Sequence, residues 1–337
     1  MKRSLAVAVL CGLLSLYLPP LAIAQQLSAA GATFPYPVYA KWFDSFSARH
    51  PAISIRYQPV GSETGIQRLK DGSVDFAASE MPLTDEQIAQ FSAGVLHFPS
   101  VLGGVVPIYN LPSVARDLRF TPEALAGIFL GRIRRWNDPV LRAANRGMRL
   151  PDSEIVVVHR ADGSGTSYVW TDYLAKVSPD WRRMVGSGTS VNWPAGVSAE
   201  FNEGVAQRVG GTPNAIGYVE FIFALRNRLS YGLVRNAAGK FVQADLVTIA
   251  KSVPSHDIPD DLRVSITNAA DPDAYPIVAF TYFLIPARIS SPDKKQAIIA
   301  FLEWMLTYGQ HQSAALGYAA LPDTVIARER EVLAQIR

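Results

Sequence analysis

The sequence has one cysteine among its 337 residues, and that residue, Cys11, lies close to the start. A chain that lost this start would contain no disulfide, no thiolate nucleophile and no cysteine-based metal site. The chain also has no large excess of positive or negative residues, since Lys and Arg total 32 and Asp and Glu total 29. Without Lys2 and Arg3 the totals are 30 and 29, a net charge of +1. Such a chain has no broad field for nucleic acid, so an anion is expected only at one local site.

The chain has no long run of apolar residues beyond its first segment. There, Lys2 and Arg3 precede a mostly apolar run from Leu5 to Leu18, and "AIA" follows. This layout predicts a secretory signal peptide over residues 1–24, and the run is short for a membrane span. The alternative is an uncleaved N-terminal anchor. Leu10 before the cysteine argues against a lipid anchor, because a lipoprotein signal needs a small residue near the cleavage point.

The short motifs of several enzyme classes are absent. A nucleophile elbow needs G-x-S-x-G, but Asp162 stands two residues before Ser164, and "VGSETG" around Ser62 also fails. Neither glycine loop supplies the lysine of a P-loop, and the histidines form no H-E-x-x-H metal motif. We therefore expect no metal, no cofactor and no enzyme. A serine hydrolase whose partners are scattered along the chain stays open, because a triad is a spatial arrangement.

Short apolar runs alternate with helical periods, which predicts an α/β protein, and the length suits two domains. The expected strands are Ile53–Val60, Val74–Ser79, Gly103–Asn110, Glu154–His159, Ala215–Glu220 and Tyr275–Ile285. The expected helices are the segment after Pro35, Thr121–Leu130, Gly165–Lys176 and Asp293–Thr307. A turn-rich connector, "GRIRRWNDP", separates two of these regions.

Three segments share one design, a loop of glycines and hydroxyl residues that leads directly into a helix. They are "GATFPYP" (31–37), "VGSETGIQRL" (60–69) and "ADGSGTSYV" (161–169). The first amides of a helix have no intrahelical acceptor, and together with the helix dipole they attract anions. Ser and Thr are also ordinary helix caps, so one such loop alone is weak evidence. Three loops favour a shared anion site if they converge in space.

The third loop adds a charged pair, Arg160 and Asp162. The planar guanidinium offers a fork of donors to a tetrahedral oxyanion and stays charged at any relevant pH. Asp162 would hold that fork from behind and offset its desolvation. The plainer alternative is a surface ion pair, which contributes little.

Several segments of the chain resemble the periplasmic phosphate-binding proteins of ABC-type phosphate importers (the PstS family). The segments are "SAAGATFPYPVYAKWFDSF", "YQPVGSETGIQRLKDGSVDFAASEMPLTDE", "VVVHRADGSGTSYVWTDYLAKVSPDW", "NAIGYVEFIFALRNRL", "YPIVAFTYFLI" and "YAALPDTV". They cover essentially the whole chain after the expected signal peptide, in order, and "RADGSGTS" is close to a family signature. The resemblance implies a two-lobed periplasmic-binding fold of type II, each lobe a mixed sheet flanked by helices, with the ligand in the hinge cleft.

The resemblance also implies a set of phosphate-binding residues. The ligand oxygens would be bound by Thr33, Phe34, Ser62, Arg160, Ser164, Gly165 and Thr166, with Asp162 orienting the arginine. The family places an aspartate acceptor after the strand that carries "VDFGAS", and here Glu80 stands at that position. A carboxylate in an anion site repels the ligand unless the ligand brings a proton, as hydrogen phosphate does and sulfate does not. Glu63 in "GSETG" departs from the small residues of the family and would either face solvent or add a second acceptor.

We expect one lobe to combine residues 25–104 with 275–337, and the other to span 105–274. The implied function is binding of inorganic phosphate in the periplasm and delivery to the permease and ATPase subunits of an importer, by a monomer that binds no nucleic acid. One alternative is a binding protein for another oxyanion, such as arsenate, sulfate or a phosphonate. A secreted phosphate-ester hydrolase and an extracellular or adhesive role also stay open.

Overall fold

The computed structural model describes residues 25–114, 117–254 and 258–337. The expected signal peptide, residues 1–24, lies outside the described residues. Among the residues that are described, no helix has both the length and the apolar character needed to cross a membrane. The description thus begins at Gln25, the first residue of strand β1 (Gln25–Gly31).

Within this described part, the main sheet has nine strands in the order β2-β1-β3-β12-β4-β8-β6-β7, and β9 also pairs with β4. Their bounds are β2 Ile53–Pro59, β3 Phe76–Ser79, β4 Val95–Tyr109, β6 Val156–Arg160, β7 Val197–Ala199, β8 Ala215–Glu220, β9 Ser230–Tyr231 and β12 Val278–Pro286. A small sheet has the order β11-β10-β5, with bounds Phe241–Val242, Leu233–Arg235 and Arg119–Phe120.

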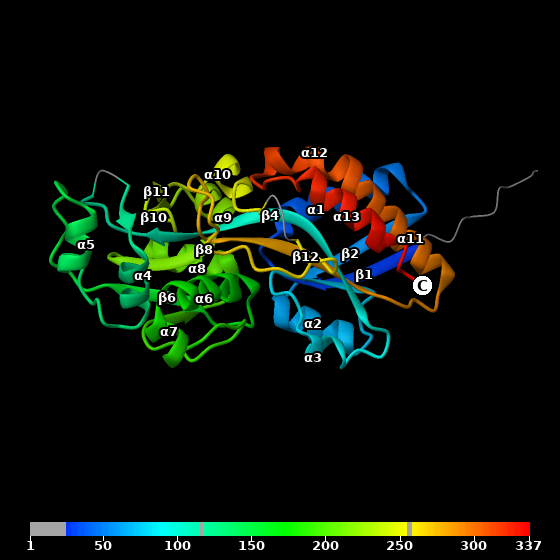
Figure 1. Ribbon diagram of the computed structural model, residues 1–337, viewed down its shortest axis with the longest axis horizontal. Coiled ribbons are helices and arrows are strands. Elements are labelled where there is room, and N and C mark those ends of the chain that lie inside the picture. Colours follow the sequence, from blue (N-terminus) through cyan, green and yellow to red (C-terminus); the bar gives the residue numbers. More distant parts are fainter. Residues whose placement is uncertain (1–24, 115–116, 255–257) are drawn as a thin grey trace, which may run out of the picture.

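The long strand β4 belongs to both halves of the main sheet. Residues 95–104 pair with β12, and residues 105–109 pair with β8, in both cases antiparallel. In the first half β1 runs parallel to β2 and β3, and in the second half β6 runs parallel to β7 and β8. Both halves are therefore mixed sheets, joined through one strand that runs from right to left in Figure 1.

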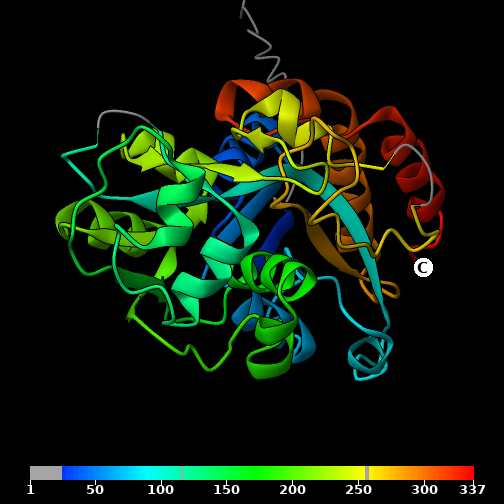
Figure 2. The same ribbon diagram turned by 60° about the vertical axis from the view of Figure 1, so that its left-hand side comes forward.

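Helices flank the sheet on both faces. The helices of the first half are α1 Tyr36–Arg49, α2 Ser62–Lys70, α3 Asp85–Ile88, α11 Pro292–Trp304, α12 Gln310–Ser313 and α13 Asp323–Leu333. A π-helical turn, Met305–Gly309, and a 3-10 turn, Ala314–Leu316, connect the last of them. The remaining helices are α4 Pro122–Phe129, α5 Pro139–Ala144, α6 Gly165–Val177, α7 Pro179–Met184, α8 Phe201–Gly211, α9 Phe221–Arg226 and α10 Leu246–Ala250. Figures 1 and 2 show these two groups of elements side by side.

The structure confirms the α/β class and most of the expected elements. The expected strand Ala215–Glu220 is β8 with the same bounds, whereas the strand expected at Gly103–Asn110 is only the second part of β4. The first part of β4 contains Pro99, which is unfavourable inside a strand. Pairing with β12 along that whole stretch overrides this local preference, with a register irregularity where Pro99 lies opposite Tyr282. Tertiary pairing likewise makes a strand of β1, whose small residues gave no strand signal.

Helix α1 shows how the apolar periodicity builds the core. Tyr39, Trp42, Phe43 and Phe46 follow the helical spacing, and all four side chains are buried. Tyr39 stacks on Phe283 of β12 with ring centroids 4.4 Å apart, so the helix packs directly on the sheet. This contact fixes the start of α1, and with it the loop that precedes the helix.

Helix α13 carries an unusual core residue, Glu329. Its side chain is fully buried, and neither carboxyl oxygen has a hydrogen-bond partner among the described residues. Burial raises the pKa of this carboxyl well above its ordinary value, because the charged form is poorly solvated there. The pKa of this carboxyl is therefore higher in the folded state than in the unfolded state. Between the two pKa values, the folded protein keeps a proton that the unfolded chain releases. Glu329 consequently destabilises the fold increasingly as the pH rises above about 4.5.

We expect Glu329→Gln to increase the free energy of unfolding at pH 8 by about 1–3 kcal/mol, because it removes the ionisation without changing the shape. At pH 4.5 the variant and the wild type should differ little. Urea unfolding at the two pH values measures this difference. Glu331→Gln, an exposed position on the same helix, serves as the control and should show no comparable pH dependence. An equal effect of Glu329→Gln at both pH values would contradict the assignment.

Candidate functional site

The three parallel strands of the first half end at the same edge of the sheet. In the register Gly31 of β1 lies opposite Pro59 of β2 and Ala78 of β3. The residues that follow these strands, Thr33, Ser62 and Glu80, are thereby brought to one place, and each is at most 5% exposed. The carboxyl ends of parallel strands are the usual position of ligand sites in α/β sheets.

The second half presents its own strand ends to the same region. Arg160 is the last residue of β6 and pairs in parallel with Ala199 of β7. The loop after β6 leads into α6, and the segment after β7 leads into α8. The two segments are tied together, because the amide of Phe201 donates to the Asp162 carboxylate at 3.0 Å.

Glu80 is held by two hydroxyl groups. Ser62 Oγ donates to Glu80 Oε2 at 3.2 Å, and Thr281 Oγ1 of β12 donates to Glu80 Oε1 at 3.0 Å. Burial raises the pKa of Glu80 to about 7, although these two hydrogen bonds and the charge of Arg160 act in the opposite direction. Glu80 is thus a buried carboxyl that exchanges its proton near neutral pH.

Arg160 and Asp162 form a buried two-point ion pair. Arg160 Nε donates to Asp162 Oδ1 at 2.8 Å and Nη2 donates to Oδ2 at 2.5 Å, with the guanidinium side chain only 1% exposed. Burial by itself would raise the pKa of Asp162, but the hydrogen bonds and charge of Arg160 hold it below its ordinary value. The pair is therefore ionised, and it fixes the plane of the guanidinium.

Asn202 at the start of α8 joins the loops of the two halves. Its Nδ2 donates to Thr33 Oγ1 at 3.1 Å and to Thr166 Oγ1 at 3.3 Å, while its Oδ1 accepts from the Glu220 amide at 3.0 Å. Arg160 Nη1 also donates to Thr166 Oγ1, at 3.3 Å. Hydroxyls from two separate loops and the guanidinium thus belong to one connected network.

Helix α6 adds its amino terminus to this network. Ser164 is its N-cap, and its Oγ accepts from the Ser167 amide at 3.1 Å. The next two amides, of Gly165 and Thr166, occupy positions that have no intrahelical acceptor. A methyl group at Gly165 would collide with the Glu80 carboxyl and the Ser62 hydroxyl. Only glycine at this position allows the helix start to approach the acceptor so closely.

Hydrogen bonds join Thr33, Arg160, Asp162 and Thr166 through Asn202 in one group. Ser62 and Glu80 form a second group, against which Gly165 lies beside its neighbour Ser164. Phe34 is fully buried in the turn beside Thr33, and its carbonyl accepts from Tyr318 Oη at 2.7 Å. The role expected for its backbone amide stays a prediction.

Two polar residues of the network, Thr281 and Asn202, were not expected from the sequence. Thr281 stands within the apolar run "IVAFTYFLI", and a threonine there is an ordinary strand residue. Asn202 follows "VSAE" at the start of a helix, which gave a signal only for a cap. Neither position carries the glycine and hydroxyl pattern of the three loops, so only their spatial position identifies them.

Two arrangements typical of enzymes, a metal-ligand group and a hydrogen bond between a serine and a histidine, are absent from the described residues. No group of three or more His, Cys, Asp or Glu among them is arranged to hold a metal ion. None of the hydrogen bonds in the described part of the chain joins a serine hydroxyl to a histidine. His97, for example, is buried in the core, where its Nε2 accepts from the Leu83 amide at 3.0 Å.

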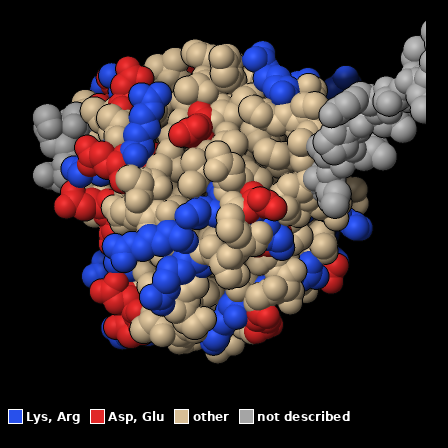
Figure 3. All heavy atoms as spheres, turned by 90° about the vertical axis from the view of Figure 1, so that its right-hand side faces the viewer, with Lys and Arg blue, Asp and Glu red and all other residues tan. Residues whose placement is uncertain are grey.

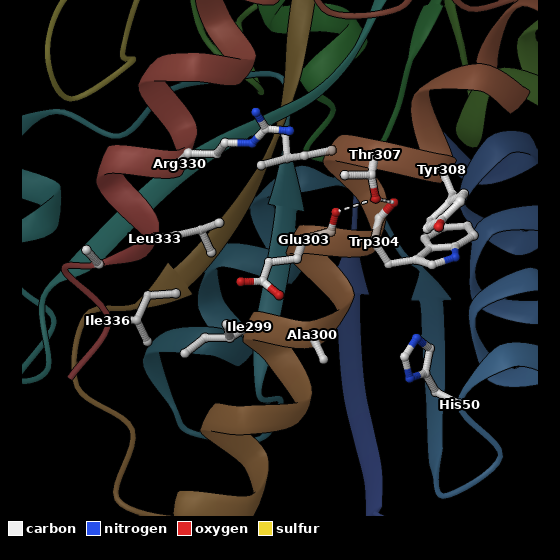
Figure 4. Close-up of a pocket in the computed structure, with 12 residues that line it drawn as sticks. His50, Ile299, Ala300, Glu303, Trp304, Thr307, Tyr308, Arg330, Leu333 and Ile336 are labelled. Atoms are coloured by element: carbon white, nitrogen blue, oxygen red, sulfur yellow. Dashed lines mark hydrogen bonds between the residues drawn. The ribbon is translucent and has the colours of Figure 1, made fainter.

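A separate cavity of about 820 Å³ lies between α11, α13 and the end of α1. Figure 4 shows Ile299 on one side, Leu333 and Ile336 on another, and His50 and Tyr308 at the far end. It shares no residue with the polar network. The molecular face shown in Figure 3 carries basic and acidic side chains interspersed, in keeping with the small net charge of the chain.

Comparison with known proteins shows the family of this chain. The model of the PBP superfamily domain matches residues 20–307. The phosphate-binding protein PstS of Pasteurella multocida is 38% identical over 330 residues, covering 97% of this chain and 94% of that protein. The chain belongs to the PstS family. A PstS protein of Xylella fastidiosa is 40% identical over 304 residues, covering 89% of this chain and 83% of its own length.

A solved structure shares the fold of this PstS family chain. The high-affinity periplasmic phosphate-binding protein PfluDING, bound with phosphate, has a TM-score of 0.71 at 20% identity, covering 91% of this chain and 93% of its own. The expected periplasmic-binding-protein fold, with mixed sheets flanked by helices, is confirmed. Members of the PstS family are binding proteins and not enzymes, as the sequence motifs indicated.

We expect Thr281→Val to raise the pKa of Glu80 further, because the substitution removes a hydrogen bond that favours the charged carboxylate. Carboxyl 13C chemical shifts followed through a pH titration measure this pKa. Thr307→Val, whose hydroxyl bonds only to backbone carbonyls of its own helical segment, should leave it unchanged. A Glu80 pKa that stays the same or falls in Thr281→Val would show that the hydrogen bond has no such effect.

Proposed function

We propose that this PstS family protein binds inorganic phosphate at the network between the two sheet halves. The proposed ligand contacts are Thr33, Phe34, Ser62, Glu80, Arg160, Ser164, Gly165 and Thr166, with Asp162 positioning the arginine. The observation that carries the proposal is the meeting of three glycine and hydroxyl loops with one buried arginine and one buried carboxyl. The relatives named for phosphate binding support the same ligand.

The donors and the acceptor of this site suit a protonated tetrahedral anion. Arg160, the hydroxyls and the first amides of α6 are donors for ligand oxygens that carry charge. Glu80 is an acceptor for a proton on the ligand. A ligand without a proton would leave the carboxylate facing an anion with nothing between them, which is strongly unfavourable in a buried site. Phosphate near neutral pH satisfies this acceptor, and sulfate does not.

We further propose that the two sheet halves are two lobes. The first lobe comprises residues 25–104 and 275–337, and the second comprises residues 105–274. The change of partner along β4, from β12 up to Gly104 to β8 from Val105, supports this division. The hydrogen bond from Asn202 to Thr33 crosses between the proposed lobes, so a ligand enclosed there would leave by separation of the lobes.

The proposed site of action is the periplasm, and the proposed partners are the permease and ATPase subunits of an ABC-type phosphate importer. The periplasmic description of PfluDING and the PstS names of the relatives support this role. The proposed working form is a monomer that releases phosphate to the membrane complex.

Isothermal titration calorimetry with phosphate, sulfate and arsenate tests the ligand. We expect phosphate to bind far more tightly than sulfate at pH 8.5. The preference should shrink at pH 5.5, because Glu80 with a pKa of about 7 is then protonated and can donate to sulfate. Equal affinities for phosphate and sulfate at pH 8.5 would overturn the proposed recognition, and tighter binding of sulfate would assign a different oxyanion.

Glu80→Gln isolates the role of the carboxyl. The amide nitrogen of glutamine donates a hydrogen bond at any pH, so sulfate should bind better and the preference for phosphate should fall at least about tenfold. The pH dependence of the preference should also flatten. Glu303→Gln, an exposed position on α11, should behave as the wild type. Unchanged discrimination in Glu80→Gln would remove this residue from the proposed role.

A further inference from the structure

Glu63, at the start of α2, makes contacts across the two proposed lobes. Its Oε2 accepts hydrogen bonds from Thr189 Oγ1 at 3.0 Å and from Ser190 Oγ at 2.9 Å. Its backbone amide donates to the Gly163 carbonyl at 3.1 Å. One residue of the first lobe thus makes three hydrogen bonds to the second lobe.

The segment that contains Thr189 and Ser190 is fixed to the second lobe. The Thr189 carbonyl accepts from the Ser164 amide at 3.0 Å, at the start of α6. The Gly188 amide donates to Thr171 Oγ1 at 3.1 Å, further along the same helix. Because the segment is tied to α6 at two points, separation of the lobes must break the bonds to Glu63.

The backbone opposite Glu63 is shaped to receive this side chain. A methyl group at Gly163 would collide with Cβ and the carboxyl of Glu63. The absence of a side chain at Gly163 therefore lets α2 and the loop before α6 approach each other. This close approach is formed beside Ser62 and Ser164, two of the proposed phosphate contacts.

Glu63 and Glu80 lie in different surroundings, so their carboxylates have different roles. Glu63 is exposed at the rim of the lobe boundary, whereas Glu80 is 2% exposed. The two hydroxyl donors occupy Oε2 of Glu63, and both belong to the 188–190 segment and not to the phosphate network. The sequence analysis expected Glu63 either to face solvent or to act as a second acceptor for the ligand. The carboxylate is exposed, but it also accepts hydrogen bonds from across the lobe boundary.

We propose that Glu63 is a latch residue, which stabilises the closed arrangement of the lobes and slows the release of phosphate without contacting it. This inference rests on the proposed function for its ligand. Since the latch bonds form only when the lobes are closed, their loss favours opening of the closed state, so it acts mainly on dissociation and changes association little. Hydroxyl-to-carboxylate bonds are charge-assisted, but their exposure at the rim moderates their strength.

The test compares the wild type with Glu63→Ala, Ser190→Ala and Glu63→Gln by the release of 32P-labelled inorganic phosphate into excess unlabelled phosphate. We expect Glu63→Ala to release phosphate about five- to tenfold faster, with an association rate within about twofold of the wild type. Glu63→Gln keeps an oxygen acceptor and should release phosphate more slowly than Glu63→Ala. Glu303→Gln is the control for loss of an exposed charge on the first lobe.

Combining Glu63→Ala with Ser190→Ala shows whether the two residues act together. If they share one latch, the acceleration in the double variant should be smaller than the product of the two single accelerations, and the rate should be close to that of Glu63→Ala. Unchanged release in Glu63→Ala, a slower association that explains the whole effect, or equal acceleration by Glu303→Gln would each overturn the latch.

Small-angle X-ray scattering of the phosphate-free proteins gives a readout that needs no ligand. We expect a larger radius of gyration for Glu63→Ala than for the wild type, because the open arrangement becomes more populated. Equal radii together with equal release rates would refute the latch. A wild-type protein that binds no phosphate would overturn the proposed function, and the latch would then be judged on the scattering alone.

Discussion

The buried pair of Arg160 and Asp162 is the interaction on which the site depends. A guanidinium that is 1% exposed has lost almost all of its contact with water, so it needs an anionic partner and hydrogen-bond acceptors within the protein. Asp162 supplies two of these acceptors and is itself held by the Phe201 amide. The fold meets this requirement by ending β6 and β7 at the same edge, which brings the two loops together. The guanidinium is left with a fixed orientation toward the hydroxyls of the network.

Glu80, on the opposite side of the network, is a buried carboxyl, so its negative charge is also poorly solvated. The hydrogen bonds from Ser62 and Thr281 and the nearby charge of Arg160 lower the pKa of Glu80. Desolvation is the larger effect and raises this pKa to about 7. In the proposed function, this acceptor distinguishes anions by whether they carry a proton. Burial of charge therefore underlies both the dependence of Arg160 on Asp162 and the selectivity proposed for Glu80.

Much of the site was predictable because its signals are local. Glycine and hydroxyl residues before a helix mark a place where backbone amides are free, and Arg160 with Asp162 two residues later marks the charged centre. The resemblance to the phosphate-binding proteins added the expectation of Glu80 as an acceptor and of two lobes, and both stay proposals. Thr281 and Asn202 were not predictable, since a threonine in a strand and an asparagine at a helix start have ordinary local roles. Their functions follow from partners about 200 and 170 residues away in the chain, respectively.

Local sequence determined the α/β class, the aromatic face of α1, the three glycine loops and the chemical character of their residues, because these depend on spacing and residue type. Only the tertiary structure decided that β1 is a strand between β2 and β3, that β4 runs through both halves of the sheet, and that the loops converge. It also decided the partners of Glu63, whose carboxylate takes two hydroxyls more than 120 residues away. Such contacts join segments that no periodicity links, so the energy of long-range pairing and burial determined them.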